Sequence, residues 1–407
     1  MTIPIITNAD DYNRATRYLD NRRYDKALQF YRKQTGEFKE KYLNMGNCYK
    51  FTHNPKKAYE CYLMAADSKT PFSDGVYGDY DLAINNLGLM EYAFGNDSVA
   101  MEVFSHGINV APNNHSIRWH LGISQLRQVF SNNLLIDKVS AFINYDYRFY
   151  LDANKTALDA CYTRWDGVST GDSIIVLAEQ GLGDKIQWNR YSVLLKRYFR
   201  RVVLQIPEML WPLFPGWEVC TTRDNIVPCT HSVPLCSLTR YFDINDAPHD
   251  YLGTFSGYDF GGGGLKIGIV NSGSPGHKND YNRSCNISYF SGLAGPSIQL
   301  YNLQPNAKPA RNIINLNPKT WLETCGYVSG LDLIISVDTS IVHIAGALNK
   351  PCWMLNPLCD TDFRWGDDTM GVNNVWYPTV RVLRNPNNWD ALFKTVKESL
   401  SDFNCKS

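Results

Sequence analysis

The 407-residue chain has no excess of charge of either sign, because its 40 Lys and Arg residues balance its 40 Asp and Glu residues. A broad basic surface for nucleic acid or a membrane is therefore not expected, although "KRYFRR" (196–201) forms one local basic run. No apolar run approaches the roughly 20 residues that cross a bilayer. The N-terminus also lacks the basic start and long apolar core of a signal peptide. We therefore expect a cytoplasmic protein without a membrane span.

The cysteines lack the spacing of a disulfide framework or a zinc site. The chain has 11, an odd number, and no CxxC pair. Cys220, Cys229 and Cys236 come closest to a cluster. Scattered cysteines of this kind are typical of reduced, mostly buried thiols in a cytoplasmic protein.

The N-terminal third contains a repeated pattern of small and large residues. Two stretches, "YLNMGNCYKFTHNPKKAYECYLMAAD" and "AINNLGLMEYAFGNDSVAMEVFSHGINVAPNN", align so that Gly46 matches Gly88, Ala58 matches Ala100 and Tyr62 matches Phe104. Pro112 closes the second unit, and a third begins at Leu121-Gly122. This pattern resembles the tetratricopeptide repeat, in which small residues lie where two helices touch. Residues 1–135 are therefore expected to form an all-α repeat array, followed by a connector over 136–170.

A stack of such repeats leaves a concave groove. The groove is expected either to dock a protein, glycan or other hydroxyl acceptor, or to act only as a spacer or as a contact in a homo-oligomer. The sequence leaves these alternatives open.

The C-terminal two-thirds alternates predicted strands with predicted helices, which indicates parallel sheets covered by helices. The glycine run Gly261–Gly264 is a candidate joint between a first lobe, 171–260, and a second lobe, 261–407. Two lobes of this kind form a cleft, and ligands bind at the carboxyl ends of the strands. Three strand ends are therefore candidate site segments.

One strand end lies in "LIISVDTSIVH", where a strand stops at Val337 and a helix starts near Ser340. The free backbone N–H groups of such a turn, with the hydroxyls of Thr339 and Ser340, can hold a diphosphate, and Asp338 can accept bonds from sugar hydroxyls. The alternative is that Asp338 or Thr339 only caps the helix. His343, three residues into the helix, faces either the ligand or the core.

A second strand end is the loop "NSGSPGHKNDYNRS", which contains His277, Lys278 and Arg283. Lysine and arginine at this position can neutralise phosphates, and arginine offers a two-pronged grip. Ordinary surface charges on a solvated loop are the alternative.

The remaining strand end, "SIIVLAEQGLGDKIQWNRY", combines a buried strand over Ile174–Ala178 with an amphipathic helix expected over Lys185–Tyr198. Its glycine-rich turn fails the dinucleotide pattern, since Ile186 stands at the third glycine position. Asp184 at a helix N-terminus would repel a phosphate, but it suits a hydroxyl whose proton must be removed. A helix cap is the alternative role for Asp184.

Four ordered blocks, "AEQGLGDKIQWNRY", "GHKNDYNRS", "LDLIISVDTSIVHIAGALNKPCWML" and "RWGDD…VWYPTVRVLR", together resemble the glycosyltransferase-like domain of bacterial tetratricopeptide proteins. That domain is related to the heptosyltransferases and, more distantly, to the O-linked N-acetylglucosamine transferases. The resemblance covers 165–395 and implies a GT-B fold, with two Rossmann-like lobes around a cleft. It also implies transfer from a nucleotide-sugar, usually with inversion, that needs neither a metal nor a cofactor.

The same resemblance implies roles for individual residues of the first lobe. The aspartate of the first Gly-Asp turn is the base proposed in heptosyltransferases, and it matches Asp184, with Glu179 as the reserve candidate. Gln180, Gly181 and Gly183 complete the acceptor-side loop.

In the second lobe, the Val-Asp-Thr-Gly turn that grips the donor in heptosyltransferases matches Asp338, Thr339 and Ser340, with serine in place of glycine. The basic loop matches Lys278. Arg283 and His343 complete the predicted donor site.

Two other functions stay open from the sequence. One is a catalytically inert scaffold whose repeats bind a protein, and the other is a glycosyltransferase that acts on modified nucleic acid. The combination of Asp184, Lys278 and Asp338 favours the enzyme, because a scaffold needs none of the three.

Overall fold

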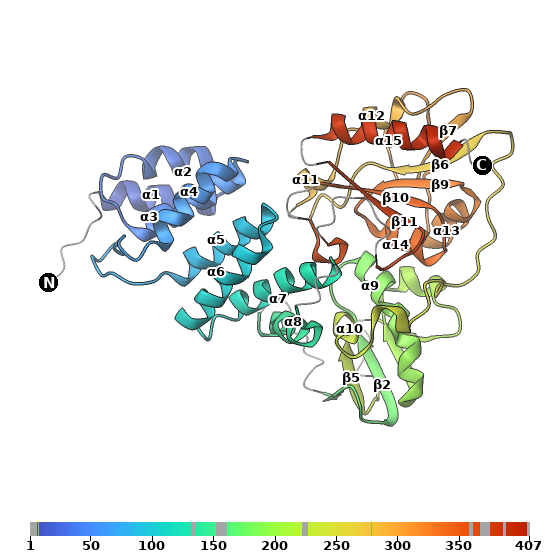
Figure 1. Cartoon of the computed structure of the whole chain (residues 1–407), viewed down its shortest axis with the longest axis horizontal. Coiled ribbons are helices and arrows are strands. Elements are labelled where there is room, and N and C mark those ends of the chain that lie inside the picture. Colours follow the sequence, from blue (N-terminus) through green and yellow to red (C-terminus); the bar gives the residue numbers. More distant parts are fainter. Residues whose placement is uncertain are drawn as a thin grey trace. The chain divides into compact units, whose positions relative to one another are not determined.

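The computed structural model describes residues 6, 8–131, 136–151, 161–221, 227–277, 279–357, 361–366, 375–385 and 388–404. The chain divides into two compact units, Met1–Leu151 and Asp152–Ser407. Figure 1 shows their helices and strands and labels many of them. In the described part of the chain, no helix has both the length and the apolar character needed to cross a membrane.

The first unit is helical, as predicted. Its helices are α1 (Ala9–Asp20), α2 (Tyr24–Tyr31), α3 (Lys39–Phe51), α4 (Pro55–Ala66), α5 (Asp81–Ala93), α6 (Asp97–Val110), α7 (His115–Phe130) and α8 (Lys138–Tyr145), with the 3-10 helix η1 (Asp146–Tyr150) after α8. Successive helices pack in pairs, α1 with α2, α3 with α4, α5 with α6 and α7 with α8.

Two of these helix pairs, α3 with α4 and α5 with α6, have a glycine at their contact, at the positions that the sequence alignment matches. A Cβ atom on Gly46 would lie 2.5 Å from the Tyr62 ring, and one on Gly88 would lie 2.5 Å from the Phe104 ring. Both rings are fully buried. The glycines therefore let each aromatic ring reach the backbone of the partner helix, which explains the alternation of small and large residues.

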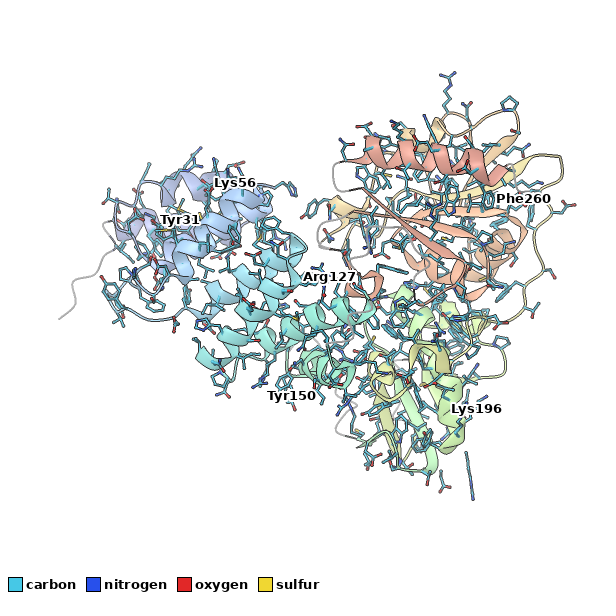
Figure 2. The ribbon with its side chains drawn as sticks, in the orientation of Figure 1. Tyr31, Lys56, Arg127, Tyr150, Lys196 and Phe260 are labelled. Carbon is cyan, nitrogen blue, oxygen red and sulfur yellow. The ribbon has the colours of Figure 1, made fainter. Side chains whose placement is uncertain are left out.

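The first unit extends beyond the predicted repeat boundary at residue 135. A Cβ atom on Gly122 of α7 would lie 2.3 Å from the Tyr145 backbone nitrogen, so α8 packs tightly on α7. Arg127 of α7, labelled in Figure 2, is buried and donates from Nε to both carboxylate oxygens of Asp97 at 2.9 Å. The first part of the segment expected as a connector, 136–151, is thus an integral part of the helical unit.

The first lobe of the second unit is a parallel sheet. Its strands are β1 (Thr163–Arg164), β2 (Gly171–Leu177), β3 (Phe199–Gln205), β4 (Glu218–Cys220) and β5 (His231–Pro234). They pair in the order β1-β5-β2-β3-β4. Between and after the strands lie α9 (Leu182–Trp188), η4 (Asn189–Arg197), η5 (Glu208–Leu213), η6 (Leu235–Ser237), α10 (Leu238–Tyr241) and η7 (Ile244–Asp246).

The helix expected over Lys185–Tyr198 is shorter and begins earlier. The α-helix ends at Trp188, and the 3-10 helix η4 continues from Asn189. The Asn189 side chain donates from Nδ2 to the Lys185 carbonyl at 2.7 Å, and its Oδ1 accepts from the Ser192 hydroxyl at 3.0 Å. A side chain that bonds the backbone in this way competes with the regular helical ladder.

The second lobe is also a parallel sheet. Its strands are β6 (Leu265–Val270), β7 (Ile298–Asn302), β8 (Ile313–Asn315), β9 (Leu333–Val337), β10 (Cys352–Pro357) and β11 (Val380–Asn385), in the order β11-β10-β9-β6-β7-β8. Its helical segments are α11 (Asp280–Arg283), α12 (Ser288–Ser291), α13 (Trp321–Gly330), α14 (Ser340–Ala347), η8 (Phe363–Trp365) and α15 (Trp389–Asn404). The C-terminal helix α15 packs its apolar face, including Phe393 and Val396, into the core of this lobe.

The glycine run predicted as a joint directly precedes β6. Gly261, Gly262 and Gly264 have φ values of 58°, 64° and 86°, a backbone region that residues other than glycine rarely adopt. Phe260, labelled in Figure 2, anchors the run by packing on the Tyr301 ring with centroids 4.5 Å apart.

Candidate functional site

The turn after β2 is held in one shape by its own side chains. Gln180 has a left-handed φ of 59°, and the Gly181 N–H donates to Asp184 Oδ2 at 2.8 Å. The buried Lys185 ammonium donates to the carbonyls of Glu179, Gln180 and Gly181 at 3.2, 2.6 and 3.3 Å. Asp184 therefore caps the start of α9 with one oxygen, and its other oxygen is left for a different partner.

That partner is Arg364, which sequence reasoning missed. Its Nη2 donates to Asp184 Oδ1 at 2.5 Å, across 180 positions of sequence and from the second lobe to the first. Its Nη1 donates to Gln187 Oε1 at 2.9 Å and its Nε to Asp362 Oδ1 at 2.8 Å. The guanidinium is buried and joins carboxylates of both lobes.

The charges around Arg364 set the protonation of Asp184. Burial acts to raise the pKa of the Asp184 carboxyl, but the Arg364 guanidinium outweighs it and lowers the pKa below its usual value. Asp184 is therefore an anion at neutral pH.

His343 lies between the lobes. It is only 2% exposed, it stacks on Trp365 with ring centroids 5.5 Å apart, and its Nδ1 lies 3.3 Å from the Tyr377 hydroxyl. A Cβ atom on Gly183 of the first lobe would lie 2.8 Å from the imidazole. Burial, followed by the charge of Arg364, lowers the pKa of His343 to about 3, so the ring is neutral.

The turn between β9 and α14 carries the predicted donor residues. Asp338, Thr339 and Ser340 are half-buried, and the Thr339 side chain makes no capping bond to α14. Thr339 Oγ1 lies 3.2 Å from Ser336 Oγ instead. Burial, followed by the charge of Asp362, raises the pKa of Asp338 to about 6, while Arg364 and Arg283 act to lower it.

Arg283 reaches this turn from the loop after β6. Its Nη1 donates to the Asp338 carbonyl at 3.1 Å, and its Nε donates to Asp280 Oδ1 at 3.3 Å. The guanidinium lies directly over Gly273, where a Cβ atom would be only 2.4 Å from Nη2. Lys278, the other predicted cation of this loop, lies outside the described residues.

The structure thus brings Asp184, Arg283, Asp338 and His343 to one place, with Asp362 and Arg364 among them. The Glu179 carboxylate bonds within the first lobe, where its Oε1 accepts from the Cys236 N–H of η6 at 2.8 Å. Within the described ranges, no three His, Cys, Asp or Glu side chains are grouped so that they could hold a metal ion.

Comparison with known proteins finds a family match within the second lobe. Residues 282–355 match the family model described as glycosyltransferase family 9 (heptosyltransferase). This segment includes Arg283, Asp338, Thr339, Ser340 and His343. The match bears out the prediction that the chain is a glycosyltransferase. None of the curated proteins matches the chain.

Several solved structures are similar at low identity. ADP-heptose lipopolysaccharide heptosyltransferase II of E. coli is 14% identical, with 58% of this chain and 99% of that chain covered and a TM-score of 0.41. A mutant O-GlcNAc transferase of Thermobaculum terrenum is 11% identical, with 96% and 90% covered and a TM-score of 0.34. YrrB, a TPR protein with an unusual peptide-binding site, is 16% identical, with 36% and 78% covered and a TM-score of 0.26. The two parallel-sheet lobes fit the GT-B-like fold expected from the sequence.

Proposed function

We propose that this chain transfers a sugar from a nucleotide-sugar to an acceptor hydroxyl by direct, metal-independent displacement with inversion at the anomeric carbon. The observation that carries the proposal is the ion pair between Asp184 and Arg364, which places a carboxylate of the first lobe at the cationic groups of the second. The first lobe presents the Asp184 carboxylate, and the second presents the Arg283 and Arg364 guanidiniums beside the N-terminus of α14.

In this mechanism the acceptor oxygen attacks the anomeric carbon while its proton passes to the Asp184 carboxylate. The bond from that carbon to the diphosphate oxygen breaks, and the electron pair leaves with the nucleoside diphosphate. Arg283, Lys278 and the N-terminal amides of α14 stabilise the departing negative charge. Asp338 accepts hydrogen bonds from the sugar hydroxyls. His343, which is neutral, packs on Trp365, the residue next to Arg364.

The helical unit is proposed to be a tetratricopeptide-repeat array that docks the acceptor. Support comes from the glycine-to-ring contacts of Gly46 with Tyr62 and Gly88 with Phe104, which recur at matched positions. A nucleic-acid acceptor is less favoured, because Arg201 of the local basic run is bonded to Glu218 through Nε at 2.9 Å and Arg200 lies 3.8 Å from Asp172.

A thermal-shift panel tests donor binding. ADP-, UDP-, GDP- and CMP-sugars are each added at millimolar concentration. ADP-heptose is included because the matched family is described as heptosyltransferase and because one similar structure is a complex with ADP-D-beta-D-heptose. A ligand at about 100 times its Kd stabilises the fold by about 2.7 kcal/mol, which gives a clear rise in melting temperature.

The free nucleosides serve as the control and should give no shift, since they lack the diphosphate. Folded protein that shows no shift with any nucleotide-sugar would contradict the proposal.

A further inference from the structure

The two carboxylates that bind Arg364, those of Asp362 and Asp184, differ in how easily a ligand can replace them. Asp362 lies two residues away in the same turn, and its Oδ1 also accepts the Arg364 backbone N–H at 3.1 Å, so this contact is local to η8. Asp184 belongs to the other lobe, and only the side-chain bond at 2.5 Å connects its carboxylate to Arg364. Of the two carboxylates, Asp184 is therefore the one that can leave without a change in the turn.

The local charge balance gives a reason for such an exchange. Asp184, Asp338 and Asp362 all act on Arg364, and Arg283 is the other guanidinium that acts on Asp338. Asp280 also accepts from Arg283, so four carboxylates of the described residues share these two guanidiniums before any donor is present. A diphosphate adds further negative charge at the same place, so it must compete with a carboxylate for a guanidinium.

A second observation points to an unused ligand group beside Arg364. The Gln187 side chain is fully buried, its Oε1 accepts from Arg364, and its Nε2 has no hydrogen-bond partner in the described structure. Buried donors are normally satisfied by protein, water or ligand. A diphosphate at Arg364 carries more oxygens than one carboxylate and can offer this amide an acceptor.

We propose that Arg364 is exchanged between Asp184 and the donor diphosphate, so that Asp184 is released toward the acceptor only after the donor has bound. This inference rests on the proposed function. The Gly181 N–H still holds Asp184 Oδ2 when Arg364 leaves, so the carboxylate keeps its orientation and only Oδ1 is freed. A carboxylate without a guanidinium partner is also the stronger base, which suits proton removal. The consequence is an order of events in which donor binding precedes acceptor activation.

Arg190 shows what a purely structural arginine looks like in the same unit. It is fully buried and also links the two lobes, but its acceptors are the His249 ring at 3.1 Å and backbone carbonyls, Trp376 at 2.7 Å and Ala247 at 2.9 Å among them. Those carbonyls are part of the fold and have no role for which they must be freed. Arg364 differs because its partner on the other lobe is an ionised side chain.

Calorimetry with inorganic diphosphate at pH 8 tests the exchange on the full chain. Asp184→Asn removes the competing charge, so its diphosphate Kd should fall by about three- to tenfold relative to the unaltered chain. In the Arg364→Gln background, Asp184→Asn should change the Kd little, because the shared guanidinium is absent. Glu218→Gln is the matched control: it removes one carboxylate from the exposed Arg201 pair of the same lobe and should leave the Kd unchanged.

Three results would overturn the inference. These are no diphosphate binding to the unaltered chain, no tightening in Asp184→Asn, or equal tightening with and without Arg364. If Arg364→Gln does not fold, Arg364→Lys replaces it. Lysine keeps the positive charge but lacks the paired N–H donors of the guanidinium. The effect of Asp184→Asn on the diphosphate Kd should therefore shrink in this background. The nucleotide-sugar panel tests the proposed function separately from this exchange. The diphosphate measurement does not depend on any nucleotide or sugar, so failure of the exchange can be told from failure of the proposed function.

Discussion

Replacing Gly273 with alanine should displace the Arg283 guanidinium without removing any charged group. The new methyl group would lie 2.4 Å from Nη2 and 2.6 Å from both Cζ and Nε of Arg283. Such distances are far below van der Waals contact, so the guanidinium must move. It can move because it is the end of a flexible side chain, whereas the backbone at residue 273 is not in the left-handed region and accepts alanine. The fold should therefore remain intact while the 3.1 Å bond from Arg283 to the Asp338 carbonyl is lost.

The size of the effect follows from the bond that Arg283 is proposed to make to the donor. A hydrogen bond to a charged group contributes about 1.5–3 kcal/mol, which corresponds to about a 10- to 150-fold weaker donor Kd. Calorimetry with the nucleotide-sugar that gives the largest thermal shift measures it. Gly276→Ala is the control in the same loop, since the nearest atom to its new methyl group is Ser274 Oγ at 3.8 Å.

Arg283→Gln should weaken donor binding to the same extent, and combining it with Gly273→Ala should add little, because both changes remove one contact. The reasoning is refuted if Gly273→Ala binds the donor as tightly as the unaltered chain does. It is also refuted if Gly273→Ala and Gly276→Ala lower affinity equally.

Two further predictions concern pH and the helical unit. The pKa of Asp338 is raised to about 6, and a bound diphosphate would raise it further, so donor binding takes up a proton. The diphosphate of a nucleotide-sugar does not titrate near neutrality, so donor affinity should rise as the pH falls from 8 to 6, by at most about tenfold per pH unit. Asp338→Asn should flatten this profile. A pH-independent Kd measured by calorimetry would contradict it. Gly88→Ala should lower the melting temperature, because overpacking against Phe104 costs about 1–3 kcal/mol while alanine gains only about 1 kcal/mol of helix propensity. Gly78→Ala, whose methyl group meets only the Phe72 ring at 3.8 Å, should leave the melting temperature nearly unchanged, and equal melting temperatures for the two variants would argue against the packing role of Gly88.

Local sequence patterns predicted the strand ends well because each depends on neighbouring residues. The apolar run before Asp338 ends at Val337 and the helix begins at Ser340, as the sequence predicts. The buried strand before Glu179 is also present, as β2. Residues that meet at the carboxyl edge of a parallel sheet are expected to lie close, and Arg283 does reach the Asp338 turn by its bond to the Asp338 carbonyl.

Arg364 was missed for a physical reason. It lies in "TDFRWGDD" after β10, a stretch with no periodicity, and its value comes from contacts with Asp184 and Gln187 that are 180 and 177 positions away. The block "RWGDD" that carries part of the family resemblance begins at Arg364, but the resemblance implies no role for this arginine. Similarly, the end of α9 at Trp188 depends on the side-chain bonds of Asn189, which hydrophobic periodicity does not reveal. The extent of the helical unit depends on the packing of α8 on Gly122.

The central claim is that Asp184 removes the acceptor proton while the second lobe holds a nucleotide-sugar. Hydrolysis of the panel of nucleotide-sugars tests it most directly, because water then takes the place of the acceptor hydroxyl and free sugar and nucleoside diphosphate are released. The released nucleoside diphosphate is measured for the unaltered chain, Asp184→Asn and Glu179→Gln. Asparagine keeps the size and caps a helix about as well as aspartate, but its amide takes no proton at neutral pH. The account predicts release by the unaltered chain and a fall of roughly 10²–10⁴-fold in Asp184→Asn, the usual contribution of a positioned base, with the donor still bound. Near-normal release in Asp184→Asn would contradict the account, and a collapse in Glu179→Gln alone would assign the base to Glu179.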